Sequence, residues 1–320
     1  MAGLALAWGG NWPAMKFGLD AGGLPPLWLA ALRFVLGALC LAPFVVLLCG
    51  RGRGGFTAWM PLPAASDRPI LIVGALGPMA GLTALACLAL AVLPAGPSAV
   101  VAYSTSLWVV PAAWWWLRER PGAGPLIGVA LGLSGIVAMS GPWALDWSDP
   151  RVLLGQAALL VAAALWAASI LHVRARGGRL ATPLPVLVLW QLALAAGLLL
   201  PVALLAEGPP PLASLLASPA ALLALLYVGP LGTALAFMLM LEVNRRLSAT
   251  GMATATLAVP PTGLLLGWAL LGEKPTAAAF LGAAMVVAGV ALAALVRPPV
   301  AASPGSRTQP FSQPQGCNNS

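Results

Sequence analysis

The chain has 320 residues, of which 60% are hydrophobic and only 8% are charged. A soluble domain carries about 25% charged residues, so this composition excludes a soluble fold and indicates that most of the chain lies in a lipid bilayer. The net charge is +8, but the basic residues lie in short connections between apolar runs. That placement is typical of orientation in a membrane and does not indicate a nucleic-acid partner.

Ten apolar runs are each close to the roughly 20 residues that a helix needs to cross the hydrocarbon core. They predict an all-α membrane protein with ten transmembrane helices, at residues 2–19, 26–49, 69–92, 97–117, 123–141, 152–173, 184–206, 219–241, 250–271 and 276–296. The connections are rich in Gly and Pro. Residues 297–320 form a polar, Pro- and Ser-rich tail that we expect to be disordered.

The first run lacks a basic flank and contains Gly9, Gly10, Asn11 and Pro13. These features argue against a cleaved signal peptide. They favour a first spanning helix that is interrupted near its middle. The sequence leaves open whether the true start lies upstream of Met1.

Charge placement predicts the orientation of the chain. With the N-terminus in the cytoplasm, the outer side receives Asp20, Asp146, Asp149, Glu207 and Glu273. Cytoplasmic segments then hold 12 of the 16 Lys and Arg residues, namely Arg51, Arg53, Arg68, Arg118, Arg120, Arg174, Arg176, Arg179, Arg245, Arg246, Arg297 and Arg307. Because cytoplasmic loops carry the excess of Lys and Arg, both termini are expected on that side.

The two halves of the chain share a repeated pattern. An offset of 154 residues relates four pairs, Glu119 and Glu273, Pro121 and Pro275, Gly128 and Gly282, and Gly135 and Gly289. A fixed offset indicates internal duplication. Each half would hold five helices, and because five is odd, the second half would enter the membrane from the opposite side. Inverted repeats of this kind are the architecture of many secondary transporters.

Six different short motifs follow one another along the chain. They are Trp8-Gly9-Gly10-Asn11-Trp12, residues 27–36 (LWLAALRFVL), 102–121 (AYSTSLWVVPAAWWWLRERP), 164–170 (ALWAASI), 226–237 (LYVGPLGTALAF) and 260–275 (PPTGLLLGWALLGEKP). Through them the chain resembles the drug/metabolite transporter superfamily, specifically the ten-helix exporters with two EamA-type domains. The resemblance implies EamA-like repeats at 1–141 and 152–296. It also implies export of small metabolites, amino acids or drugs from the bacterial cytoplasm.

The same resemblance implies a helix-bending proline ahead of each charged corner. Pro260 stands 13 residues before Glu273, whereas the equivalent place before Glu119 holds Ser106, and the nearby proline is Pro111. Pro111 and Pro260 are therefore candidates for bends that assist gating. We expect Glu119 and Glu273 to pair with Arg or to cap a helix.

Arg33 is the strongest candidate for a residue of the substrate pathway. It lies about eight residues into the second run, or roughly 12 Å along a helix, and a charge at that depth is costly enough to suggest a function. It would attract an anionic group of a solute or anchor a gate. The alternative, a structural bond to helix carbonyls, is equally compatible with the sequence.

Other polar and aromatic residues within the runs are further pathway candidates: Trp8, Asn11, Tyr103, Ser104, Trp108, Trp166, Gln156 and Gln191. Trp166 is the apparent counterpart of Trp8 in the second half. For the amides, the alternative is an interhelical hydrogen bond. For Ser104 it is a bond to its own backbone.

These observations predict a secondary transporter that exports a small metabolite, amino acid or drug-like solute across the bacterial plasma membrane by alternating access. The alternative is a sensor or assembly partner with the same fold and no net flux. A single His, four unpatterned Cys and no acid within a span indicate no catalytic group, no metal and no cofactor, and hence no enzyme. The expected partners are the bilayer and a small solute, while the oligomeric state stays open.

Overall fold

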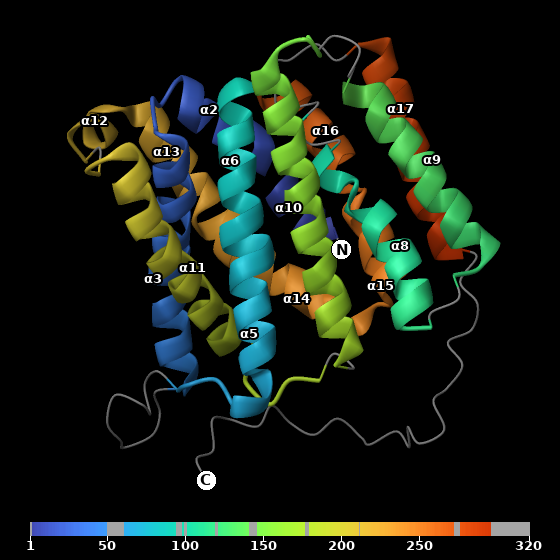
Figure 1. The fold of residues 1–320 in the computed structure, drawn as a ribbon, viewed down its shortest axis with the longest axis horizontal. Helices are drawn as coiled ribbons and strands as arrows, with labels where there is room; N and C mark the ends of the chain where they lie inside the picture. The colour runs from blue at the N-terminus through green and yellow to red at the C-terminus, as the bar shows by residue number, and fades with distance from the viewer. Residues whose placement is uncertain are drawn as a thin grey trace.

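The computed structural model describes residues 2–49, 61–93, 98, 101–118, 121–140, 146–176, 179–210, 212–271 and 276–295. Within these ranges the regular secondary structure is entirely helical (Figure 1). This confirms the all-α class.

Five helical spans are long and apolar enough to cross a membrane. Three of them are continuous: α3 (Pro26–Cys49), α10 (Pro150–Ala175) and α11 (Leu184–Glu207). Two are composite. The first joins η1 (Ala65–Asp67), α5 (Arg68–Gly74), η2 (Ala75–Gly81) and α6 (Leu82–Val92), and the second joins α13 (Pro219–Val228), η4 (Pro230–Leu235) and α14 (Ala236–Arg246). All five fall on predicted spans, with ends shifted by a few residues.

Each composite span contains a π-helical segment at a proline, Pro78 in η2 and Pro230 in η4. Proline removes a backbone N–H and crowds the preceding turn, so the helix widens there. In both composite spans a threonine hydroxyl, at the second position of α6 or within η4, donates to the carbonyl five residues earlier. Thr83 lies 3.4 Å from the Pro78 oxygen, and Thr233 lies 2.6 Å from the oxygen of Val228.

Three further predicted spans are helical but interrupted. The first divides at Gly10 into α1 (Ala2–Gly9) and α2 (Asn11–Asp20). The fourth has a turn at Ser104 before α8 (Thr105–Trp116), and the ninth divides at residues 257–258 between α15 (Ala249–Thr256) and α16 (Val259–Leu271). Irregular backbone at membrane depth is tolerated only where protein buries it or a cavity adjoins it. The number of membrane crossings therefore stays a prediction.

The remaining two predicted spans are shorter apolar helices, α9 (Ala123–Ser140) and α17 (Ala277–Leu295). They lie side by side at one edge of the bundle (Figure 1). Their backbones approach so closely at Gly289 that a Cβ added there would lie 2.9 Å from the Gly132 nitrogen. Small residues permit this kind of contact between membrane helices.

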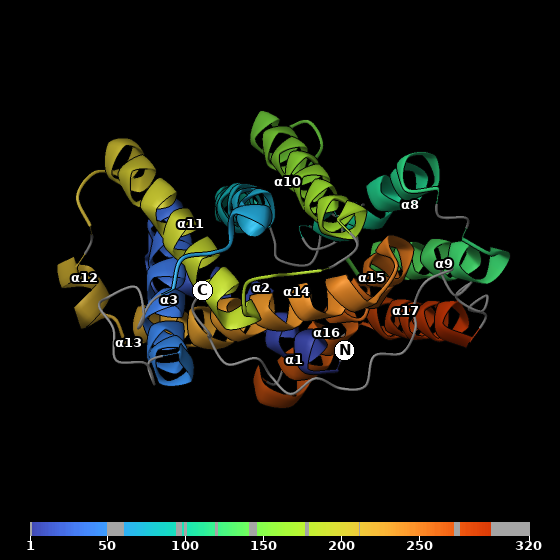
Figure 2. The ribbon, with the colours of Figure 1, turned by 90° about the horizontal axis from the view of Figure 1, so that it is seen from below.

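The other helices pack around the middle of the molecule, with α3 along α11 and α10 along α6 (Figure 1). In the view from below, α1 lies beside α16 (Figure 2). A short helix, α12 (Leu212–Ala217), connects α11 to α13. The main buried cluster draws on both halves of the chain, including Phe34, Met79, Leu159 and Leu187. The halves thus share one core.

Two carboxylates bind helix beginnings at opposite ends of the bundle (Figure 1). Glu207, at the end of α11, accepts hydrogen bonds from the N–H groups of Leu27 at 2.9 Å and Trp28 at 3.0 Å, in the first turn of α3. Asp67, in η1, accepts from Ala181 at 2.9 Å and Thr182 at 2.6 Å, just before α11. Each half therefore supplies an acid that satisfies free N–H groups near a helix start in the other half.

Candidate functional site

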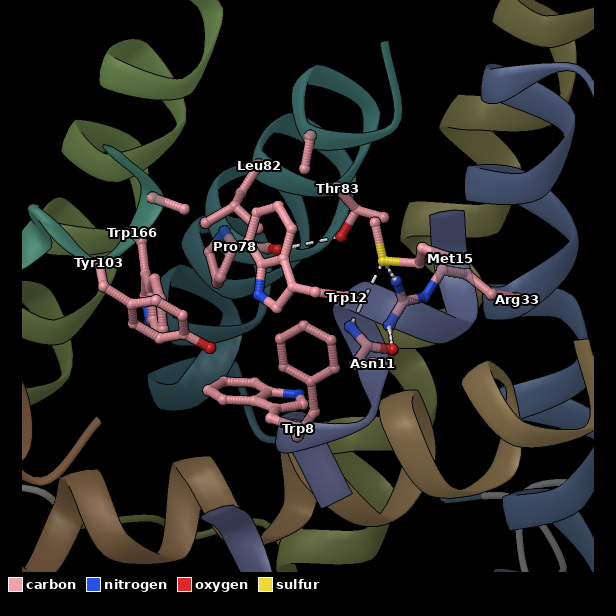
Figure 3. Close-up of a pocket in the computed structure, with 13 residues that line it drawn as sticks. Trp8, Asn11, Trp12, Met15, Arg33, Pro78, Leu82, Thr83, Tyr103 and Trp166 are labelled. Atoms are coloured by element: carbon pink, nitrogen blue, oxygen red, sulfur yellow. Dashed lines mark hydrogen bonds between the residues drawn. The ribbon is translucent and has the colours of Figure 1, made fainter. Parts of the chain in front are cut away.

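A cavity lies where the interrupted first span meets α6, α10, α14 and the turn before α8 (Figure 3). Its empty space is about 510 Å³, including the part that opens to the surroundings. It is lined by Trp8, Asn11, Trp12, Met15, Arg33, Pro78, Leu82, Thr83, Ala86, Ala102, Tyr103, Trp166 and Phe237.

Aromatic rings from four helical segments form much of the lining. Trp8 meets Trp166 edge to face, with ring centroids 5.3 Å apart and an interplanar angle of 85°. Trp166 also meets Tyr103 at 5.8 Å, and Trp8 meets Phe237 at 5.7 Å. Edge-to-face pairs at these distances are favourable, so the rings hold one another in a fixed wall for an apolar group.

Arg33 places a positive charge at this cavity. It is 2% exposed, and its guanidinium donates four hydrogen bonds to neutral acceptors. Two of these acceptors are Met15 Sδ at 3.0 Å and Asn11 Oδ1 at 3.2 Å (Figure 3). The other two are Thr233 Oγ1 at 2.8 Å and the Gly232 carbonyl at 3.1 Å. None of the ion pairs found among the described residues includes Arg33. Among the described residues the charge is therefore solvated by dipoles and has no counter-ion.

Backbone carbonyls of the interrupted helices accept several of the hydrogen bonds around the cavity. The Gly232 carbonyl, in the π-helical segment η4, accepts from Arg33 and also from Trp8 Nε1 at 3.2 Å. In α1, the carbonyls of Leu6 and Ala7 each accept from the Tyr227 hydroxyl at 3.3 Å. The breaks in the helices thus expose carbonyl groups that side chains from other helices then satisfy, as buried backbone requires.

Trp166 carries a buried donor without an acceptor. Its Nε1 has no hydrogen-bond partner, although the side chain lines the cavity beside Tyr103. An unpartnered buried N–H costs about 1–3 kcal/mol. A bound molecule with a hydrogen-bond acceptor would remove that cost, so the cavity combines a cation, a free donor and aromatic faces.

Five of the predicted pathway residues meet at this cavity: Trp8, Asn11, Arg33, Tyr103 and Trp166. The others do not line it. Gln191 is buried and donates from Nε2 to the Ile70 carbonyl at 2.9 Å, beside a smaller cavity. Ser104 donates to the Val101 carbonyl at 2.6 Å, in the turn before α8. Trp108 is largely exposed on α8, and Gln156 is buried with Oε1 unpartnered.

The predicted gating and corner residues lie elsewhere. Pro111 lies inside α8, and Pro260 lies in the first turn of α16, directly after the interruption at residues 257–258. Glu119 and Glu273 fall outside the described residues. The roles assigned to these four residues stay predictions.

Sequence reasoning missed several residues that build the site, above all Met15, Thr83, Phe237 and Thr233. A usable signal was present for the threonines. Gly-Pro is followed within a few residues by Thr-Ala-Leu-Ala in both halves, ending at Ala86 and at Ala236. This repeated motif coincides with the two π-helical segments.

The apolar spans and interrupted helices are typical of a polytopic membrane protein, and an aromatic cavity with a buried cation lies among them. The chain belongs to the EamA-like transporter family, whose sequence model matches residues 1–141 and 153–295. This confirms the resemblance to the drug/metabolite transporter superfamily.

Similar proteins include two uncharacterized transporters. YoaV of Bacillus subtilis (strain 168) is 25% identical over 299 residues, which cover 90% of this chain and 92% of YoaV. A protein of Archaeoglobus fulgidus is 25% identical over 287 residues, covering 90% of this chain and 93% of that protein. A solved crystal structure, 21% identical, matches the fold with a TM-score of 0.71 over 93% of this chain and 99% of that chain.

Proposed function

We propose that this protein is a secondary transporter that exports a small amphipathic solute, such as an amino acid or a drug-like metabolite, across the bacterial plasma membrane. Movement is by alternating access between two inverted repeats, and both termini lie in the cytoplasm. The observation that carries the proposal is the buried cation of Arg33 at an aromatic cavity, where none of the described residues supplies a counter-ion.

The chemistry of the cavity favours a solute with an anionic or strongly polarised acceptor group. Arg33 attracts negative charge from a distance even though its N–H groups already bond to protein acceptors. Trp166 Nε1 is free to donate a hydrogen bond directly. The rings of Trp8 and Tyr103 offer faces to an apolar portion of the same molecule.

The placement of the helix interruptions supports a conformational cycle. The repeat offset of 154 residues relates Ser104 to Ala258, and both positions are turns between helical segments. A break at related places in each half gives each repeat a point at which its helices can change direction. Transporters commonly use discontinuous helices in this way around a central site.

Flux into proteoliposomes tests the proposal, with a panel of radiolabelled amino acids and aromatic carboxylates. Wild type is compared with Arg33→Ala, with Trp166→Phe, and with Arg151→Ala as an exposed control on α10. We expect uptake of at least one solute, reduced by roughly 10-fold or more in Arg33→Ala because a charge interaction is lost. The control keeps wild-type flux.

A solute that binds purified protein but never crosses the bilayer, in either direction and with or without a pH gradient, would overturn transport. It would favour the sensor or assembly partner instead. Flux that is unchanged in Arg33→Ala would keep the transporter and reduce Arg33 to a structural residue.

A further inference from the structure

A second, smaller cavity lies next to the first. Its empty space is about 270 Å³, including the part that opens to the surroundings, and its polar lining residues are Ser169, Gln191 and Asn244. Phe237 and Pro78 line both cavities. A single aromatic side chain on α14 and one proline in η2 therefore stand between the two spaces.

Asn244 gives the smaller cavity an unused hydrogen-bond acceptor. The residue is 1% exposed, and its Oδ1 has no hydrogen-bond partner. Buried side-chain oxygens nearly always have a donor, so an orphan of this kind needs an explanation. The larger cavity has the opposite polarity, because its orphan atom is the Trp166 Nε1 donor.

Two polar lining residues of each cavity occupy corresponding positions in the two halves. Gln191 follows Arg33 by 158 residues, Ser169 follows Asn11 by the same number, and α11 begins 158 residues after α3. Arg33 and Asn11 line the larger cavity, whereas Gln191 and Ser169 line the smaller one. The neutral Gln in place of Arg makes the smaller cavity uncharged, so it does not repel a cationic group.

The smaller cavity lies toward the arginine-rich end of the molecule. Asn244 is in the last turn of α14, directly before Arg245 and Arg246, and both of these arginines pair with Glu242. In the predicted orientation this end is cytoplasmic. Neither guanidinium donates to the Asn244 oxygen.

We propose that the smaller cavity is a second solute subsite, on the cytoplasmic side of Phe237, in which Asn244 Oδ1 accepts a hydrogen bond from an amine of the solute. This rests on the proposed transport function. The carboxylate-attracting site at Arg33 and the amine-accepting site at Asn244 lie on one path, and the Phe237 ring separates them. Movement of that ring enlarges the smaller space.

Thiol labelling tests the path without requiring a known solute. Asn244→Cys is made in a chain whose four native cysteines are replaced by Ser, and membrane vesicles of both orientations receive a membrane-impermeant trimethylammonium methanethiosulfonate. We expect labelling from the cytoplasmic face only. Addition of Phe237→Ala makes the same thiol react from the outer face as well.

The matched control is Ile170→Cys, which is fully buried on α10 and lines neither cavity. It should stay unlabelled in every vesicle. Labelling of Asn244→Cys from neither face, even with Phe237→Ala, overturns the subsite and leaves a sealed packing gap. Labelling from the outer face while Phe237 is intact overturns the role of the ring.

A pair of solutes tests the chemistry. Phenylalanine and 3-phenylpropionate differ only in the amino group, and both are measured in proteoliposomes. Asn244→Leu should lower phenylalanine flux by roughly 10-fold, the loss expected for one hydrogen bond to a charged donor. Asn244→Asp, which keeps the acceptor, should retain that flux, and 3-phenylpropionate should respond to neither change.

An equal fall in the flux of both solutes would overturn the amine-accepting role and make Asn244 structural. If neither solute moves in wild type, the proposed function fails for this solute class. The labelling result then still decides whether the smaller cavity belongs to a path through the protein.

Discussion

Arg33 and Thr233 are 200 residues apart in the sequence, yet Arg33 Nε donates a 2.8 Å hydrogen bond to Thr233 Oγ1. The same hydroxyl donates to the Val228 carbonyl at 2.6 Å, five residues earlier and just before the π-helical segment η4. The position of the buried cation in the first half therefore depends on a helix defect in the second half.

Thr233→Val tests this dependence, because valine keeps the shape and removes the hydroxyl. We expect the free energy of unfolding to fall by about 1–3 kcal/mol, since Arg33 loses an acceptor and a buried carbonyl loses a donor. Thr233→Ser should restore most of it. Thermal unfolding in detergent measures the effect. The matched control is Thr83→Val, whose hydroxyl makes only the longer 3.4 Å bond, and an equal loss there would contradict the role of Arg33.

Two tryptophans offer a test that separates binding from stability. Trp166→Phe removes an N–H that has no partner, whereas Trp8→Phe removes one that donates to Gly232. Both changes remove part of a buried ring and so cost packing, but only Trp8→Phe also removes a hydrogen bond, so we expect it to cost about 1 kcal/mol more than Trp166→Phe. Trp166→Phe should also weaken binding of a transported solute, measured by its concentration at half-maximal flux. Equal stability losses in the two variants would contradict the absence of a protein partner for the Trp166 N–H.

The carboxylate of Glu207 links α11 to the start of α3. Glu207→Gln keeps the size but replaces one acceptor oxygen by a donor, so one of the N–H groups of Leu27 and Trp28 loses its bond. We expect a loss of about 1 kcal/mol in unfolding free energy. The control is Glu242→Gln, a partly exposed acid paired within its own helix, which should change stability by less. Similar losses in both variants would argue against a special role for the hydrogen bonds between Glu207 and the start of α3.

Gly9 lies where α1 crosses α16. A Cβ at Gly9 would lie 2.9 Å from the Gly263 nitrogen and 3.0 Å from Thr262. Gly9→Ala should therefore force the helices apart and cost about 1–3 kcal/mol. At Gly197, on α11, a Cβ would meet nothing within 4 Å, so Gly197→Ala should stabilise by roughly 0.5–1 kcal/mol through helix propensity. Thermal unfolding of both variants measures these two changes in stability. If Gly9→Ala is as stable as wild type, the close contact between α1 and α16 is contradicted.

The uninterrupted helices could be predicted from the sequence because their ends carry strong signals. Residues 26–49 form a single apolar run that begins at a proline, and α3 has the same bounds. The π-helical segments of the third and eighth spans were not predicted, nor was the turn at Ser104. Hydropathy averages over such local changes in hydrogen bonding, so it detects an apolar segment without detecting whether its backbone is regular.

By itself the sequence determined the membrane environment, the helical class and the family, because these follow from composition, length of apolar runs and ordered motifs. Only the tertiary structure decided which residues meet. Tyr103 and Trp108 belong to the same predicted span, yet Tyr103 is 3% exposed at the cavity and Trp108 is 46% exposed. Lipid is as apolar as the protein interior, so the pattern of side chains that separates inside from outside in a soluble helix is absent here. Contacts between distant helices, such as Arg33 with Thr233, supply that missing information.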